Sequence, residues 1–205
     1  MANLNNYSKV DFTKWVYDEI QKMGKGGLIR IKAFEDTRFA PCFTLPKMRA
    51  LWGFQEDDPA ALDTMAVNTC CARWRYLHLS INSEEFAVWL RGLDQHHMDW
   101  INDHSKSLEA DSMYMCLFQP RTNSVKVKIV TDGPRKTKVF RKVSGSENQV
   151  YEDTSFKLSR DSEVFVAVTA SHLWVAGQVV GISLFATYMI VFPPALALVK
   201  DQLQL

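Results

Sequence analysis

The residues of this chain most able to do chemistry are a dense group of cations in its second half. Residues 121–142 carry eight Lys or Arg side chains against the single acid Asp132, although the whole 205-residue chain has a net charge of only +1. Ammonium and guanidinium groups bind phosphate, and aromatic rings placed among them can stack on nucleic-acid bases. The local excess of positive charge therefore indicates a polyanionic partner more strongly than the total charge does.

Strand alternation predicts how these cations are displayed. In an extended segment, Lys136, Lys138, Phe140 and Lys142 would project from one face and place three ammonium groups around an aromatic ring. The alternative is a solvated strand face with Phe140 packed into a small core. Two other expected strands repeat the mixture of cations and rings. The complete set of predicted nucleic-acid-binding residues is Arg30, Lys32, Phe34, Trp74, Tyr76, Lys126, Lys128, Arg135, Lys136, Lys138, Phe140, Arg141 and Lys142.

A second group of reactive side chains lies on one predicted helix. His96, His97 and His104 share it with Asp94, Asp99 and Asp103, but only mixed pairs such as Asp94 with His97 have ligand spacing. We therefore expect a polar helix face with one partly buried histidine, and no metal site. The sequence also lacks a Walker loop, GxSxG, HExxH or dinucleotide fingerprint. We predict a protein that is not an enzyme and needs no cofactor.

The cysteines and the first residues bear on the compartment. None of the four cysteines forms a C-x-x-C pair, and the first eleven residues contain no apolar signal segment. We therefore expect an intracellular protein with free thiols.

Residues 171–199 contain no Asp, Glu, Lys or Arg, so the run is long enough to be a membrane-span candidate. However, it is interrupted by Gly177 and Gly181 and is rich in β-branched and aromatic residues, which favour strands. We predict two buried strands that reverse near these glycines, with Trp174 in the core, and no membrane. The competing hypothesis is a viral structural or membrane-associated protein that uses residues 171–199.

The remaining periodicities define the elements that position these groups. Asp11 and the stripe Phe12, Trp15, Val16, Ile20 and Met23 predict an N-terminal helix, and Ser83 predicts the start of a long one. Alternating residues predict strands over 28–34, 74–81, 125–129, 136–143 and 164–169. The fold class is therefore α+β, built as a single domain over 1–205 around a small antiparallel barrel with flanking helices.

The order of these pieces resembles the single-stranded DNA-binding proteins of large nucleocytoplasmic DNA viruses, distant relatives of phage single-strand binders. The resemblance covers about residues 76–193 and implies an OB-type barrel with a helical insertion at about 83–118. Three stretches carry it. The first is a helix ending in Leu93-Asp94, followed by a second helical stretch and then residues 113–118, and the second is residues 125–129, a turn and Thr137-Lys138-Val139-Phe140. The third is the apolar pair Leu173-Trp174-Val175 and Gly181-Ile182-Ser183-Leu184, which runs on to Val191-Phe192-Pro193.

What the resemblance implies is a sequence-tolerant protein that coats exposed strands during viral DNA replication and recombination, without enzymatic activity. The resemblance also implies that DNA is favoured over RNA as the partner. It places the protein in the host nucleus or at a cytoplasmic viral replication site, and a homo-oligomer is compatible with it. One departure is the C-terminus. Family members of the phage type commonly end in an acidic tail, whereas residues 198–205 carry one acid and regularly spaced leucines. We expect these leucines to form a short amphipathic helix that docks on a subunit.

Overall fold

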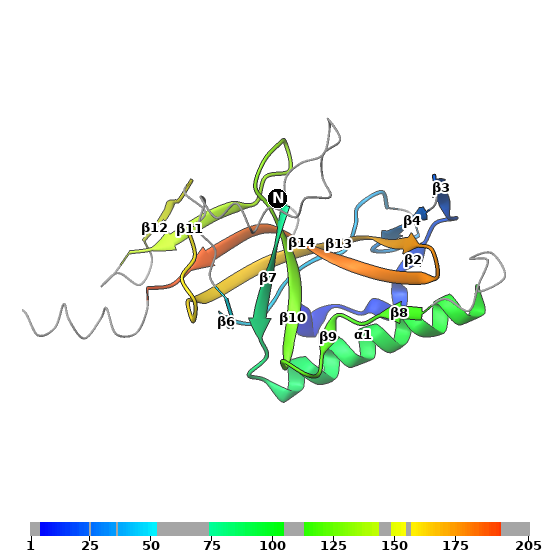
Figure 1. Cartoon of the computed structure of the whole chain (residues 1–205), viewed down its shortest axis with the longest axis horizontal. Coiled ribbons are helices and arrows are strands. Elements are labelled where there is room, and N and C mark those ends of the chain that lie inside the picture. The colour runs from blue at the N-terminus through cyan, green and yellow to red at the C-terminus, as the bar shows by residue number, and fades with distance from the viewer. Residues whose placement is uncertain are drawn as a thin grey trace, which may run out of the picture.

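The computed structural model describes residues 5–24, 26–35, 37–52, 74–104, 113–143, 149–154 and 157–193. The predicted C-terminal amphipathic helix lies outside these residues. The elements, labelled in Figure 1, are β1 (Asn5–Asn6), η1 (Tyr7–Lys9), η2 (Phe12–Lys14), β2 (Val16–Tyr17), β3 (Gln21–Met23), β4 (Gly26–Lys32), β5 (Cys42–Thr44), β6 (Met48–Ala50), β7 (Trp74–Ser80), α1 (Glu84–Asp103), β8 (Met113–Met115), β9 (Phe118–Gln119), β10 (Ser124–Val130), β11 (Lys138–Lys142), β12 (Val150–Glu152), β13 (Glu163–Ala176) and β14 (Val179–Val191).

The uncharged run forms most of a long antiparallel hairpin, β13–β14, which crosses the whole molecule (Figure 1). This confirms the prediction of strands. Gly177, at φ +58°, makes the reversal, a conformation that costs glycine little. Gly181 instead lies inside β14, where an added Cβ would come within 2.4 Å of the Trp174 ring. Trp174 is half-buried over this glycine rather than in the core.

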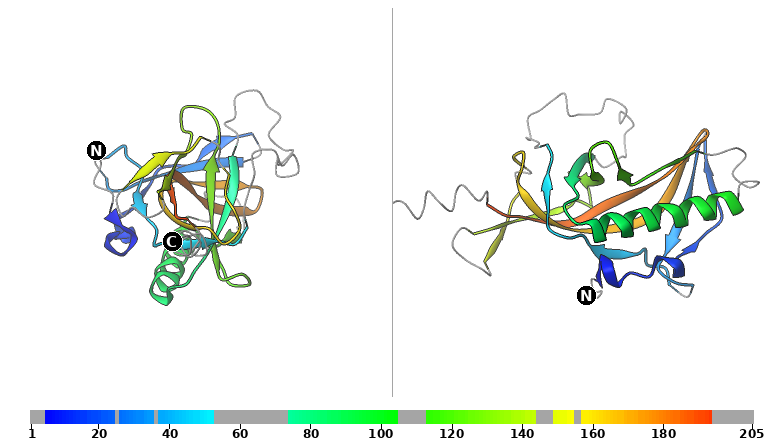
Figure 2. Two further views of the ribbon diagram at one scale, coloured as in Figure 1. Left: turned by 90° about the vertical axis from the view of Figure 1, so that its left-hand side faces the viewer. Right: turned by 90° about the horizontal axis from the view of Figure 1, so that it is seen from below.

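Strand pairing closes a ring. β13 pairs with β6, β6 with β7, β7 with β10, β10 with β14, and β14 returns to β13. The left view of Figure 2 shows strands arranged around the line of sight. The α+β class is confirmed, but the sheet is mixed rather than antiparallel, because β10 and β11 both run parallel to β14. Among the described residues, no helix is both long and apolar enough to cross a membrane.

The core lies on the inner side of these strands and follows the predicted alternation. Leu77 and Leu79 of β7 are buried, as are Val125, Val127 and Ile129 of β10. Because side chains alternate along a strand, the residues between them must project outward. Truncating any of these buried side chains to Ala is expected to cost about 2–5 kcal/mol.

The predicted N-terminal helix is wrong. Asp11 does act as a cap, since its Oδ1 accepts from Thr13 N at 3.2 Å, but it caps only the short 3-10 turn η2. Beyond it, Val16 and Tyr17 pair with β4 as strand β2. Pairing with the edge of β4 thus overrides the helical spacing, which the β-branched Val16 supports only weakly.

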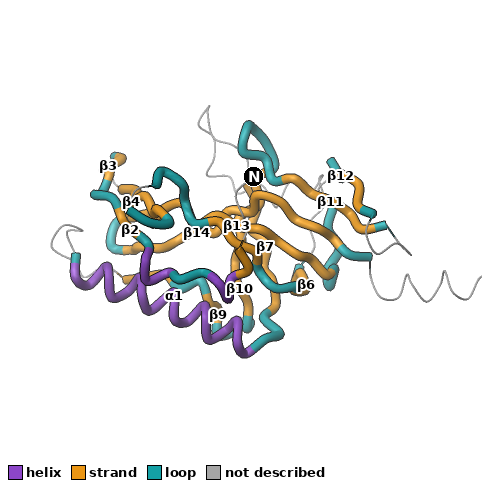
Figure 3. The backbone as a smooth tube through the Cα atoms, turned by 180° about the vertical axis from the view of Figure 1, so that it is seen from behind, coloured by secondary structure: helices purple, strands orange, loops and turns teal. Residues whose placement is uncertain are grey.

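The long helix α1 begins at the cap Ser83 as predicted and includes His97 and Asp99 as the residue pattern predicts, beyond Leu93-Asp94, where the resemblance placed its end. Ser83 caps it, with Oγ accepting from Phe86 N at 3.3 Å, and its apolar stripe is buried along one side of the sheet (Figure 3). The helix runs unbroken past Asp94 to Asp103. Residues 113–115 and 118–119 are strands β8 and β9, so the helical insertion does not extend to 118. The rest of the expected second helical stretch, 105–112, lies outside the described residues.

Candidate nucleic-acid interface

The outward side of β7, β10 and β14 gathers cations and rings into one surface. In the antiparallel pair β7–β10, Tyr76 lies opposite Lys128 and His78 lies opposite Lys126. On the other edge of β10, Lys128 lies opposite Phe185 of β14. Cross-strand partners share a face, so these side chains all project away from the buried leucines and valines.

Short contacts join these groups. Lys126 Nζ lies 3.5 Å from the centroid of the Tyr76 ring, and Lys128 Nζ lies 5.6 Å from Tyr76 and 5.3 Å from Phe185. The Phe185 ring is 5.5 Å from the imidazole of His172 on β13. We call the surface formed by Tyr76, His78, Lys126, Lys128, His172 and Phe185 the cation–aromatic face.

Two further groups lengthen the cation–aromatic face. Arg30 of β4 is exposed and lies opposite His172. At the other end, the ring of Trp52, which is 50% exposed, meets that of His78 edge-to-face at 4.7 Å. Rings and cations therefore follow one another from the residues after β6, across β7, β10, β14 and β13, to β4.

Mutual repulsion affects the basic groups of the face. Burial lowers the pKa of Lys128, and the neighbouring Lys126 lowers it further. Burial also lowers the pKa of His78, with Lys126 adding to the effect. For His172, burial comes first, followed by the charges of Lys128 and Arg135. A bound anion would offset both burial and repulsion, so the face favours phosphate electrostatically.

The structure brings only part of the predicted set to this surface. Arg30, Tyr76, Lys126 and Lys128 lie on it, and Arg135 is close enough for its charge to act on His172. Lys32 is half-buried in an ion pair with Asp18 at 2.5 Å. The Phe34 side chain is 60% exposed, but Phe34 lies beyond the last residue of β4 and therefore outside the paired strand. The Trp74 side chain lies outside the described residues.

On β11, Lys138 and Phe140 share one side of the strand, as alternation predicts. Arg141 lies on the other side and binds Asp153 at 2.5 Å. Arg141 also donates to the carbonyl oxygen of Lys157. Lys142 Nζ lies 5.5 Å from the Phe192 ring. The Arg141 guanidinium therefore already has anionic and carbonyl partners within the chain.

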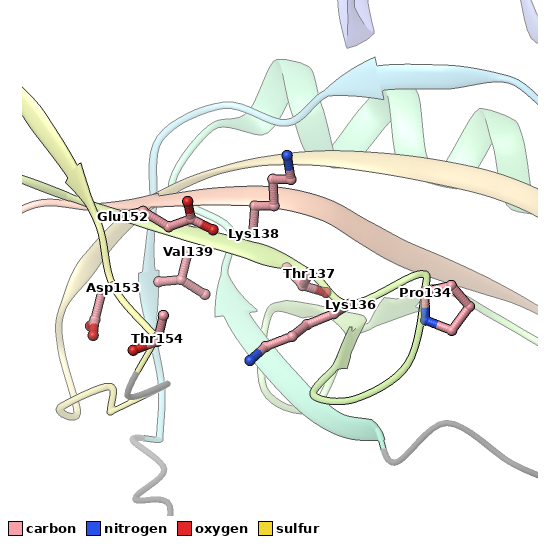
Figure 4. A pocket seen from close by; sticks show the side chains of 8 residues that line it. All are labelled: Pro134, Lys136, Thr137, Lys138, Val139, Glu152, Asp153 and Thr154. Atoms are coloured by element: carbon pink, nitrogen blue, oxygen red, sulfur yellow. The ribbon is translucent and has the colours of Figure 1, made fainter.

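Lys136 does not share a face with Lys138, contrary to the prediction. It lies in the turn after Pro134, where its N–H donates to Gly133 O at 3.1 Å, so alternation begins only at Lys138. Figure 4 shows the two side chains pointing apart across a pocket of about 210 Å³ that the acids Glu152 and Asp153 also line. These acids reduce the attraction of this region for phosphate. The pocket is lined by Pro134, Lys136, Thr137, Lys138, Val139, Glu152, Asp153 and Thr154.

The histidines and aspartates of α1 have a different environment. Asp94 is buried and accepts hydrogen bonds from Leu117 N at 2.8 Å, Phe118 N at 3.0 Å and Tyr114 Oη at 2.9 Å. The Tyr114 hydroxyl also contacts His97 Nδ1 at 2.9 Å. His97 is fully buried rather than partly buried, and burial lowers its pKa to about 3. We call Asp94, His97 and Tyr114 the buried polar cluster.

This cluster fixes the chain after α1 rather than offering an open site. Its hydrogen bonds hold the backbone at Leu117 and Phe118 against the helix. Within the described ranges, no three His, Cys, Asp or Glu side chains are grouped so that they could hold a metal ion.

Comparison with known proteins adds no assignment, since no protein-family model and no curated protein matches this chain.

Sequence reasoning missed Trp52, His78, His172 and Phe185. His78 alternates with Leu77 and Leu79, so the signal was present. Phe185 and His172 lie in the uncharged run, which suggests strands buried on both sides; only the pairing with Lys128 shows that Phe185 faces outward.

Proposed function

We propose that this protein is a sequence-tolerant single-stranded DNA-binding protein that uses the cation–aromatic face. The observation that carries the proposal is the continuous succession of rings and cations across four strands, with Lys128 between Tyr76 and Phe185. Cations spaced among rings suit a strand whose phosphates and unstacked bases are both accessible. In a duplex the bases are stacked on one another and cannot reach the rings.

Magnitudes support stacking on Tyr76 even though Lys126 lies over its ring. An exposed cation–π contact is worth about 0.5–1 kcal/mol, whereas a base stacked on an aromatic side chain contributes about 1–3 kcal/mol. The free energy lost when Lys126 leaves the Tyr76 ring is therefore smaller than the free energy gained when a base stacks on it. The displaced ammonium remains beside the strand, where it can bind a phosphate.

The ring of pairings through β13, β6, β7, β10 and β14 supports an OB-type barrel as the underlying fold. The resemblance to viral single-strand binders supports DNA over RNA, and a role in replication and recombination in the host nucleus or at a cytoplasmic viral replication site.

Fluorescence titration against a labelled oligothymidine tests the proposal. With five to seven phosphate contacts, the logarithm of the association constant should fall against that of salt concentration with a slope of about −3 to −5. Duplex of equal length serves as the control and should bind more weakly. A flat salt dependence, or equal affinity for duplex, would contradict the proposal.

A further inference from the structure

The β13 strand is irregular where it meets the cation–aromatic face. Its register with β14 shifts between Ala170 and Leu173, and this irregularity carries Ser171 and His172. Such bulges re-aim side chains at functional sites. Here Ser171 Oγ lies 2.7 Å from His172 Nδ1, so the hydroxyl fixes the imidazole ring and leaves Nε2 as its second polar atom.

Among the described residues, the charged groups that shift the pKa of His172 are both positive, and its ring contact is aromatic. β14 contributes the Phe185 ring, β10 contributes Lys128, and β4 contributes Arg30 as the cross-strand partner. Arg135, between β10 and β11, adds a further positive charge. On the β2–β4 side, the carboxylate of Asp18 is held by Lys32.

We propose that one backbone phosphate of the bound strand sits between Lys128 and His172 at the edge of the Phe185 ring, and that this phosphate anchor fixes the strand at the β13 bulge. The inference rests on the proposed function and adds to it a defined subsite for a phosphodiester. Lys128 supplies a permanent cation there, and His172 supplies a donor that becomes cationic when protonated.

The anchor has a consequence that general electrostatic attraction does not have. In the free protein, burial and the charges of Lys128 and Arg135 lower the pKa of His172 below its usual 6.5. A phosphate beside the imidazole favours the imidazolium, so the pKa rises in the complex. The complex therefore takes up as much as one proton, and binding tightens as pH falls through the pKa of the complex toward that of the free protein.

Calorimetric titration with oligothymidine at pH 6.5, in two buffers of different ionisation enthalpy, measures this uptake. We expect the full-length protein to take up a proton and His172→Gln to lose most of that uptake. His104→Gln, a matched control at the C-terminal end of α1 and outside the cation–aromatic face, should keep it. The affinity loss of His172→Gln should be about tenfold near pH 6, and smaller at pH 8 where the imidazole is neutral.

Oligothymidine that binds without net proton uptake, or uptake unchanged in His172→Gln, would overturn the anchor while leaving the proposed function intact. No binding of oligothymidine at any pH would instead remove the proposed function itself.

The histidine ring resonances distinguish a strand-held phosphate from a free one. Oligothymidine should shift the His172 signals at concentrations at which inorganic phosphate does not. An equal shift by inorganic phosphate at the same phosphate concentration would overturn the assignment to a strand anchor.

Discussion

The cation–aromatic face and the buried polar cluster both contain histidine and tyrosine, but they differ in the charged groups that surround those side chains. In the cluster, the Tyr114 hydroxyl lies 2.9 Å from His97 Nδ1, and on the face, Tyr76 and His78 project from the same side of β7. In the cluster, the carboxylate of Asp94 is supplied by the chain and accepts three hydrogen bonds. On the face, the charged neighbours that shift the pKa values of His78, Lys128 and His172 are all positive.

This difference separates a structural site from the proposed binding site. In the cluster, the chain itself supplies the hydrogen-bond partners of Asp94 and of the Tyr114 hydroxyl, and such bonds specify packing. The buried His97 Nε2 is the exception, since it has no hydrogen-bond partner among the described residues. Repelling cations on an outer face are stabilised when an anion arrives. Changes in the cluster should therefore alter folding, and changes on the face should alter binding.

The largest effect is expected at Asp94. Replacing it with Ala removes the acceptor for Leu117 N, Phe118 N and the Tyr114 hydroxyl, so the free energy of unfolding should fall by about 3 kcal/mol. Urea denaturation measures this loss. Asp94→Asn keeps one acceptor oxygen and should lose less. Weaker oligothymidine binding by the folded fraction of Asp94→Ala would contradict the division between the two regions.

Next in size is the loss of the two lysines of β10. The double variant Lys126→Gln/Lys128→Gln should bind oligothymidine about fiftyfold more weakly at low salt, with a salt slope shallower by about 1.4. The variant Lys138→Gln/Lys142→Gln removes the same charge from β11, where Glu152 lines the pocket beside Lys138, and should lose much less. Equal losses in the two variants would show that only total charge matters.

Two tyrosines provide a smaller and more direct comparison. Tyr76 is 39% exposed, so Tyr76→Ala should weaken binding by about 1.5 kcal/mol through lost stacking and leave the melting temperature unchanged. Tyr76→Phe keeps the ring and should bind normally. Tyr114→Phe should do the opposite and lower stability by about 1 kcal/mol without changing affinity. A reversed pattern would exchange the roles assigned to the two regions.

The sequence predicted these regions unequally. The strands carrying Leu77, Leu79, Val125 and Val127 follow from strict alternation, and the outward placement of Tyr76, Lys126 and Lys128 follows with them. The helix start at Ser83 follows from local capping chemistry. These features depend on neighbours within a few residues, which is why the sequence is sufficient for them.

The errors arise where distant segments decide the outcome. Val16 and Tyr17 become a strand because β4 offers an edge, about fifteen residues away along the chain. Arg141 forms an ion pair with Asp153, which follows β12 in the chain, and the sequence alone does not indicate this pairing. Phe185 and His172 join the site only through pairing between β10, β14 and β13. Long-range pairings of this kind leave no local signal in composition or period.

The smallest predicted effect concerns pH and the cluster. His97 is fully buried and its pKa is lowered to about 3 from the ordinary 6.5, so the folded protein holds it neutral. Below pH 6.5 the unfolded chain binds a proton at His97, whereas the folded chain binds that proton only near pH 3. The free energy of unfolding must therefore fall on acidification across this range. Asp94 acts with the opposite sign, because burial raises its pKa and protonation then favours the folded state as pH falls toward its ordinary 3.8.

Denaturation between pH 7.5 and 6 minimises that opposing effect. Over this range the wild-type protein should lose about 0.8 kcal/mol more than His97→Gln, whose amide can still contact the Tyr114 hydroxyl. Identical pH profiles for the two proteins would mean that His97 is charged or solvated in the folded state, and the contrast with the histidines of the cation–aromatic face would then disappear.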